Sequence, residues 1–224
     1  MASRPPHRGA PAIPDIEMAL QRLRAILPIE AGQRQLCRSL RSTHQLLLCF
    51  FLEQGRAPVA GDLPGERNWP ETLRRLDAAG LIVLDAGGID SAYPFSARDR
   101  GYHVTSAYCQ TEAVCAFDAL AISSMFRLPT RIDATCRLGG EPIRIRQNGN
   151  ELEADRNIVA AIDWSAADGD KSCAASLCTE MLFIGDESRA TAWQAEQPSQ
   201  RQLFTLQQAH GFISAFFLPL VNHN

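Results

Sequence analysis

A thiol and a carboxylate stand three residues apart near the middle of this 224-residue chain, at Cys115 and Asp118. Residues three apart on a helix share one face. A helix here would therefore place a soft nucleophile beside a group that can carry a proton. Such a pair suits a reaction in which a thiol acts as a nucleophile and a carboxyl group moves a proton.

Five other cysteines accompany Cys115 and Cys178. An odd number of cysteines without a C-x-x-C pair argues against a disulfide framework and against a structural zinc site. Free cysteines are most often small buried side chains, and we expect this of Cys37, Cys49 and Cys136. Cys109 is expected to lie away from the Cys115–Asp118 pair.

Composition restricts the class of protein. The hydrophobic content of 46% allows a packed core, and the formal net charge of −3 provides no positive field for nucleic acid. No apolar run approaches the roughly 18–20 residues of a membrane span, so we expect no membrane partner. Residues 1–14 contain Arg and Pro but no apolar segment of a secretory signal, which predicts a flexible tail and a cytoplasmic protein.

The first half of the chain has the element order of a winged helix-turn-helix, which is helices followed by a β-hairpin. The candidate recognition helix contains Glu71–Asp77, where two arginines are balanced by two acids. Two arginines are few for neutralising phosphates, so we expect a packing module and no nucleic-acid partner. The expected elements are helices at 16–27 and 32–52, a turn and short helix at 59–63, a helix at 69–79, and extended segments at 81–84 and 92–95.

The second half reads as strands framed by helices. The predicted fold class is α+β, with a winged-helix-like helical domain followed by an antiparallel β-sheet domain. We expect a tail and leading helix over 1–35, the winged-helix-like domain over 36–105 and a catalytic domain over 106–224. The expected elements are helices at 115–122, 189–196 and 203–218, and strands at 131–136, 142–146, 158–164 and 178–184.

The run Cys115-Ala116-Phe117-Asp118-Ala119-Leu120, followed by Cys136 and Cys178, resembles the signature of the organomercurial (alkylmercury) lyases. The resemblance covers about residues 36–224 and is weaker in the first half. Two departures stand out: Thr179 follows Cys178 where the best-known members have a second cysteine, and Glu112 replaces a tyrosine. An acid close to a thiol would raise its pKa. The other matching segments are Arg131–Cys136, Gly139–Ile143, Leu182-Phe183, Trp193, Gly55–Val59 and Trp69-Pro70.

The resemblance implies protonolysis of a carbon–mercury bond to a hydrocarbon and Hg(II). It implies that Cys115 and Cys178 bind mercury as thiolates, together with Asp118, which acts as the proton shuttle. It also implies an organomercurial substrate, no dissociable cofactor, a free thiol reductant, Hg(II) as bound product, and a mercuric reductase as the acceptor of Hg(II).

Two alternatives use the same cysteines. One is a winged-helix transcription regulator that responds to a soft metal or a thiol reagent. A basic, exposed helix at Glu71–Asp77 and a dimer would favour it, and a buried helix there would count against it. The other is a non-catalytic relative that binds metal. Cys173 lies near Cys178 in a polar loop and could relay mercury, but we expect it to be an exposed bystander.

Overall fold

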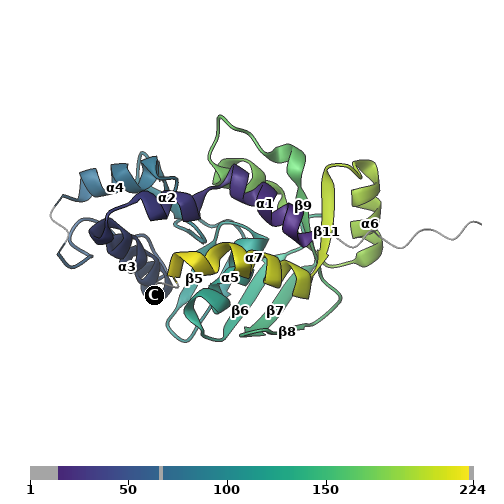
Figure 1. Ribbon diagram of the computed structural model, residues 1–224. Coiled ribbons are helices and arrows are strands. Elements are labelled where there is room, and N and C mark those ends of the chain that lie inside the picture. Colours follow the sequence, from purple (N-terminus) through teal and green to yellow (C-terminus); the bar gives the residue numbers. More distant parts are fainter. Residues whose placement is uncertain (1–14, 66–67, 222–224) are drawn as a thin grey trace, which may run out of the picture.

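An antiparallel sheet of eight strands, in the order β1-β2-β3-β5-β4-β6-β7-β8, runs through the molecule (Figure 1). The computed structural model describes residues 15–65 and 68–221, and the tail predicted for residues 1–14 lies outside them. A second sheet has the order β10-β9-β11. The strands are β1 Ile82–Asp85, β2 Gly88–Ala92, β3 Phe95–Ser96, β4 Tyr102–Thr105, β5 Gln110–Ala113, β6 Thr130–Thr135, β7 Pro142–Asn148, β8 Glu151–Ala154, β9 Val159–Asp163, β10 Met181–Ile184 and β11 Arg201–Thr205.

Helices cover the sheets, and the predicted α+β class with antiparallel strands is confirmed. None of the helices in the described residues is long and apolar enough to cross a membrane. The helices are α1 Ile16–Ile26, α2 Ile29–Gln35, α3 Arg38–Gln54, α4 Trp69–Ala78, α5 Ala116–Phe126, α6 Glu187–Glu196 and α7 Leu206–Val221, with 3-10 turns η1 Trp164–Ala166, η2 Cys173–Ala175 and η3 Leu177–Glu180.

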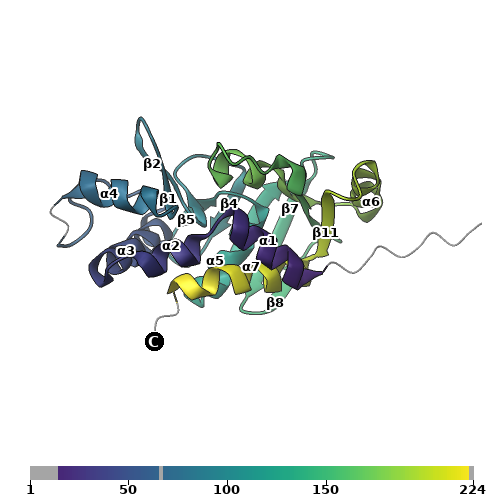
Figure 2. The same ribbon diagram turned by 45° about the horizontal axis from the view of Figure 1, so that its top comes forward.

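Helix α5 is the central buried element. It packs beside α7 and against strands of the large sheet, and α1 crosses over α7 (Figures 1 and 2). Phe117, on its first turn, packs edge-on against Phe204 and Phe212, with ring centroids 5.5 and 5.6 Å away. A helix that is apolar on all sides is stable only inside a core, and this burial fixes the helix end where Cys115 and Asp118 lie.

The hairpin β1–β2 is continuous with the large sheet, because β2 pairs with β3 and β3 pairs with β5. Helix α4 buries Thr72 and Leu76 and leaves Arg74 and Arg75 exposed. Arg74 pairs with Glu71 on the same helix. The large sheet therefore joins the two halves of the chain. The winged-helix-like domain and the domain boundary at residue 105 stay predictions.

Several predicted elements differ from the structure. The helix expected over 32–52 is two helices, because Leu36 and Cys37 adopt extended backbone between α2 and α3. The segment 59–63 forms turns without a helix. Residues 203–205 belong to β11, where Leu203 and Phe204 pair with β9, so the last helix begins only at Leu206.

Two cysteines of the first half are also less buried than predicted. Cys37 is exposed and Cys49 is half-buried. Cys37 is the N-cap residue of α3, outside the buried face of that helix. Cys109, just before β5, is half-buried and donates its thiol hydrogen to the Leu52 carbonyl of α3 at 3.3 Å.

Candidate active site

Cys115 stands at the start of α5 as its N-cap residue, with extended backbone (φ −152°, ψ −180°). Its sulfur accepts the backbone N–H of Asp118 at 3.4 Å. The thiol therefore lies over the first turn of α5. Cys115 is not itself helical, so the helix predicted to start at residue 115 starts one residue later. N-cap side chains satisfy the free N–H groups at a helix start, so the same contact orders both residues.

Cys178 reaches this helix end from a separate part of the chain. It lies in η3, just before β10, and not in the buried strand predicted for 178–184. The sulfurs of Cys115 and Cys178 and a carboxylate oxygen of Asp118 all lie within 4.8 Å of one another. All three side chains are buried: Cys115 is 1% exposed, Cys178 5% and Asp118 3%. The structure thus gathers the three residues that the sequence pattern singled out.

Burial dominates the electrostatics of this cluster. It raises the pKa of Asp118 to about 7 and that of Cys115 to about 12, because a dry site disfavours both charged forms. Hydrogen bonds with Cys115 and Cys173, together with burial, raise the pKa of Cys178 well above its usual value. Near neutral pH the cluster therefore holds neutral thiols beside a carboxyl group that can either accept or donate a proton.

Asp118 also has an uncommitted oxygen. Its Oδ2 is buried and has no hydrogen-bond partner among the described residues. A buried polar atom without a partner costs free energy, typically about 1–3 kcal/mol. In an active site this oxygen is available to a bound reactant.

A pocket of about 460 Å³ leads to Cys178 from outside. Neither Cys115 nor Asp118 lines it, although their ligand atoms lie within 4.8 Å of the Cys178 sulfur. The lining is mixed in polarity, with residues that include Arg100, Tyr102, Val114, Cys136, Arg137, Ala174 and Thr179.

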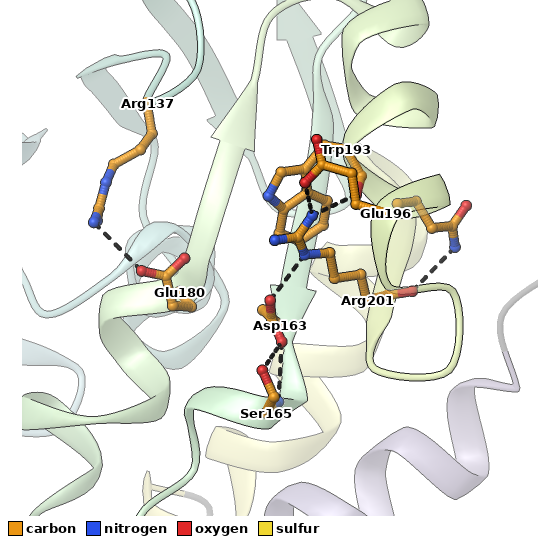
Figure 3. Close-up of polar contacts among 8 residues, drawn as sticks. Arg137, Asp163, Ser165, Glu180, Trp193, Glu196 and Arg201 are labelled. Atoms are coloured by element: carbon orange, nitrogen blue, oxygen red, sulfur yellow. Dashed lines mark hydrogen bonds and ion pairs between the residues drawn. The ribbon is translucent and has the colours of Figure 1, made fainter.

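The segment after Cys178 is held by Arg137, from the turn between β6 and β7. Its Nη1 donates to the Thr179 carbonyl at 2.8 Å, and its Nη2 pairs with Glu180 at 3.3 Å (Figure 3). Figure 3 shows Arg137 and Glu180 facing each other from two different elements. The turn that the sequence linked to the lyase family therefore fixes the backbone directly beside Cys178.

Cys173 is not the exposed bystander that we had expected. It is buried, and its sulfur lies 3.4 Å from that of Cys178. The two cysteines sit on consecutive 3-10 turns, η2 and η3, which bring residues five apart into contact. Sequence spacing gave no indication of this contact, because an irregular loop has no fixed periodicity.

Tyr93 is a site-adjacent residue to which the sequence assigned no role. Its hydroxyl accepts the backbone N–H of Ala174 at 2.9 Å, next to Cys173. Burial raises the pKa of this phenol, and the nearby Cys178, Cys173 and Asp118 add to the effect. The Tyr93 hydroxyl therefore anchors the loop that carries two cysteines.

Other residues from the family pattern lie outside the cluster. Cys136 is fully buried, and its sulfur accepts the N–H of Gly185 at 3.5 Å, as expected for a structural residue. Trp193 packs under the Arg201 guanidinium, 4.5 Å from its ring centroid, where Arg201 pairs with Asp163 at 2.9 Å (Figure 3). Glu112 pairs with His103 at 2.7 Å and does not figure among the main causes of the raised Cys115 pKa.

Comparison with known proteins identifies one family. The family model for alkylmercury lyase matches residues 95–218. Alkylmercury lyases of Bacillus cereus and Clostridium butyricum are 24% identical over 133 residues, which is 59% of this chain and 61% of each relative. The chain thus matches about three fifths of the length of these curated relatives.

A solved structure shares the fold. The mercury-bound form of MerB2 superposes with a TM-score of 0.70 at 19% sequence identity, over 90% of this chain and 100% of that one. The family model spans more than half of the sequence, and its matched region contains Cys115, Asp118 and Cys178. The chain therefore belongs to the alkylmercury lyase family.

Proposed function

We propose that this protein cleaves carbon–mercury bonds of organomercurials by protonolysis, giving a hydrocarbon and Hg(II). The observation that carries the proposal is the approach of two buried sulfurs and one carboxylate to within 4.8 Å of one another. Thiolates are the ligands that soft metals prefer, and a carboxyl group beside them can move the proton that the reaction requires.

The first step is a thiol exchange. The Cys115 sulfur binds mercury in place of the thiolate that accompanies the substrate, and the Cys115 proton leaves with the displaced thiol. Cys178 then gives its proton to the Asp118 carboxylate and binds mercury as a second thiolate. The electron density added by two sulfurs makes the mercury-bound carbon basic.

The second step is proton transfer to carbon. The protonated Asp118 donates its proton to the carbon, the carbon–mercury bond breaks, and its electron pair forms the new carbon–hydrogen bond. Hg(II) stays on Cys115 and Cys178, and Asp118 returns to carboxylate. A pKa of about 7 suits both halves of this cycle, because a general acid–base works best near the working pH.

Burial of the cluster supports the same chemistry. Cys115 and Asp118 are almost fully enclosed, so water competes little for mercury or for the proton. We further propose that a low-molecular-weight thiol keeps the cysteines reduced, that no dissociable cofactor is needed, and that a mercuric reductase accepts the Hg(II). Reduced cysteines fit the cytoplasm, which is the compartment that we expect.

The test is direct. Purified, fully reduced protein is incubated with methylmercury and excess thiol, and methane and Hg(II) are measured. We expect both products in equal amounts. Their absence, from protein whose cysteines are shown to be reduced, would overturn the proposal and favour a relative that binds metal without turnover.

A further inference from the structure

A third buried sulfur adjoins the cluster. Cys173 is 6% exposed, and its sulfur lies 3.4 Å from that of Cys178. Cys173 is not part of the set whose ligand atoms all lie within 4.8 Å of one another. In space, the three sulfurs therefore form a row in which Cys178 lies between Cys115 and Cys173.

The two ends of this row of sulfurs have different surroundings. At one end, Cys115 stands beside Asp118, whose Oδ2 has no partner among the described residues. At the other end, Cys173 lies beside the loop backbone that Tyr93 anchors through Ala174. A mercury ion bound to Cys178 can thus take either Cys115 or Cys173 as its second thiol ligand. Of these two, only Cys115 lies beside the proton shuttle.

We propose that Cys173 is a mercury ligand that takes over the product from Cys115. In this step a Hg–S bond forms to Cys173 and the Hg–S bond to Cys115 breaks. The proton released by Cys173 passes to the departing Cys115 thiolate, so charge and atoms balance without a further reactant. Hg(II) then lies on Cys173 and Cys178.

The exchange has a function in the cycle. Hg(II) that stayed on Cys115 would block the residue needed to accept the next substrate. Moving the ion to the Cys173–Cys178 pair restores the Cys115 thiol beside Asp118 before Hg(II) leaves. Mercury binds thiols tightly but exchanges between them readily when a second sulfur is already in contact, and the 3.4 Å approach supplies that contact.

This inference rests on the proposed function, and one experiment can separate the two. The parent protein for the test carries Cys37→Ser, Cys49→Ser and Cys109→Ser, because exposed and half-buried thiols would also bind Hg(II). Three variants are added to it: Cys115→Ser, Cys115→Ser with Cys173→Ser, and Cys115→Ser with Cys136→Ser as the matched control. Hg(II) affinity is measured by competition with dithiothreitol.

We expect the Cys115→Ser protein and its Cys136→Ser control to hold one Hg(II) with similar affinity. The variant that lacks both Cys115 and Cys173 should bind at least about a hundredfold more weakly, which corresponds to about 2.8 kcal/mol. Equal affinity with and without Cys173 would overturn the inference. A Cys173→Ala version, with its thermal midpoint compared to the parent, shows whether weak binding reflects lost folding.

Kinetics give the second arm. In the parent with Cys115 intact, Cys173→Ser should slow Hg(II) release about tenfold or more relative to hydrocarbon release in the same single turnover. Unchanged Hg(II) release would contradict the transfer step. Absence of hydrocarbon from every protein, the parent included, would overturn the proposed function instead, while the Hg(II) affinities would still decide whether Cys173 is a ligand.

Discussion

The sulfur of Cys115 accepts the backbone N–H of Asp118 at 3.4 Å, so the proposed nucleophile also caps the helix that carries its proton shuttle. One residue thus performs a chemical and a structural task. The two tasks can be separated by substitution, since a hydroxyl can cap a helix but does not bind mercury as a thiolate does.

Cys115→Ser should therefore lose turnover and keep its fold. Serine is a preferred N-cap residue, whereas Cys115→Ala removes the cap and should cost about 1 kcal/mol. Methane release and urea unfolding of both variants check this. Measurable turnover in Cys115→Ser would show that Cys115 is not a mercury ligand in the reaction.

Asp118→Asn should lower the rate of hydrocarbon release by at least about a hundredfold. The amide keeps the shape of the side chain but cannot carry the proton, and general acid–base catalysis is worth about 10²–10⁴ in rate. Stopped-flow or single-turnover measurement of methane tests it, with Hg(II) affinity as the control. A rate near that of the parent would mean that another group protonates the carbon.

Asp118 should also shape the dependence of stability on pH. Its pKa is about 7 in the folded protein against 3.8 for an ordinary aspartate, so the folded state binds this proton more tightly than the unfolded state. Between these values the contribution of Asp118 to stability falls as pH rises, and the full cost, at most about 4 kcal/mol, applies above the folded pKa.

Urea unfolding of the parent and Asp118→Asn at pH 4, 6 and 8 measures this effect. The difference in unfolding free energy between the two proteins should shift in favour of the variant as pH rises. A difference that is constant with pH would show that Asp118 titrates normally in the folded protein.

Cys136→Ser should cost stability without changing the chemistry. Cys136 is fully buried and its sulfur accepts the N–H of Gly185. A smaller and more polar side chain there should cost about 1–2 kcal/mol. Thermal unfolding of this variant, with the exposed Cys37→Ser as a neutral control, gives the measurement, and hydrocarbon release per folded molecule should match that of the parent.

Tyr93→Phe should loosen the loop that carries Cys173. Loss of the hydroxyl leaves the Ala174 N–H without its acceptor, which should cost about 1–3 kcal/mol. Hydrogen exchange at the Ala174 amide should accelerate more than exchange in the core of α5. Unchanged exchange at Ala174 would show that this hydrogen bond does not hold the loop.

The local part of the site was predictable, because three-residue spacing at a helix start is a property of the backbone. The resemblance pointed to Cys178, but its approach to Cys115 depends on how the loop carrying η2 and η3 returns to the end of α5. The contact of Cys173 with Cys178 and the anchoring by Tyr93 arise from irregular backbone, for which sequence periodicity carries no signal.

The fold class followed from alternating strands and apolar helices, and the errors have specific causes. Leu203 and Phe204 continue the apolar pattern of α7, but pairing with β9 makes them strand residues. Leu36 and Cys37 fit a helical pattern, yet they lie in extended backbone between α2 and α3. For Leu203 and Phe204, pairing with a distant strand therefore outweighed the helical pattern of the local sequence.

The pairing of β3 with β5 has a consequence for the rest of the large sheet. A fragment that lacked β1 to β3 would leave β5 as an unprotected edge strand, with N–H and C=O groups that had been paired now open to another chain. Such edges promote association between copies. The first half of the protein thus supplies the strands that pair, through β3, with β5 and shield this edge of the sheet.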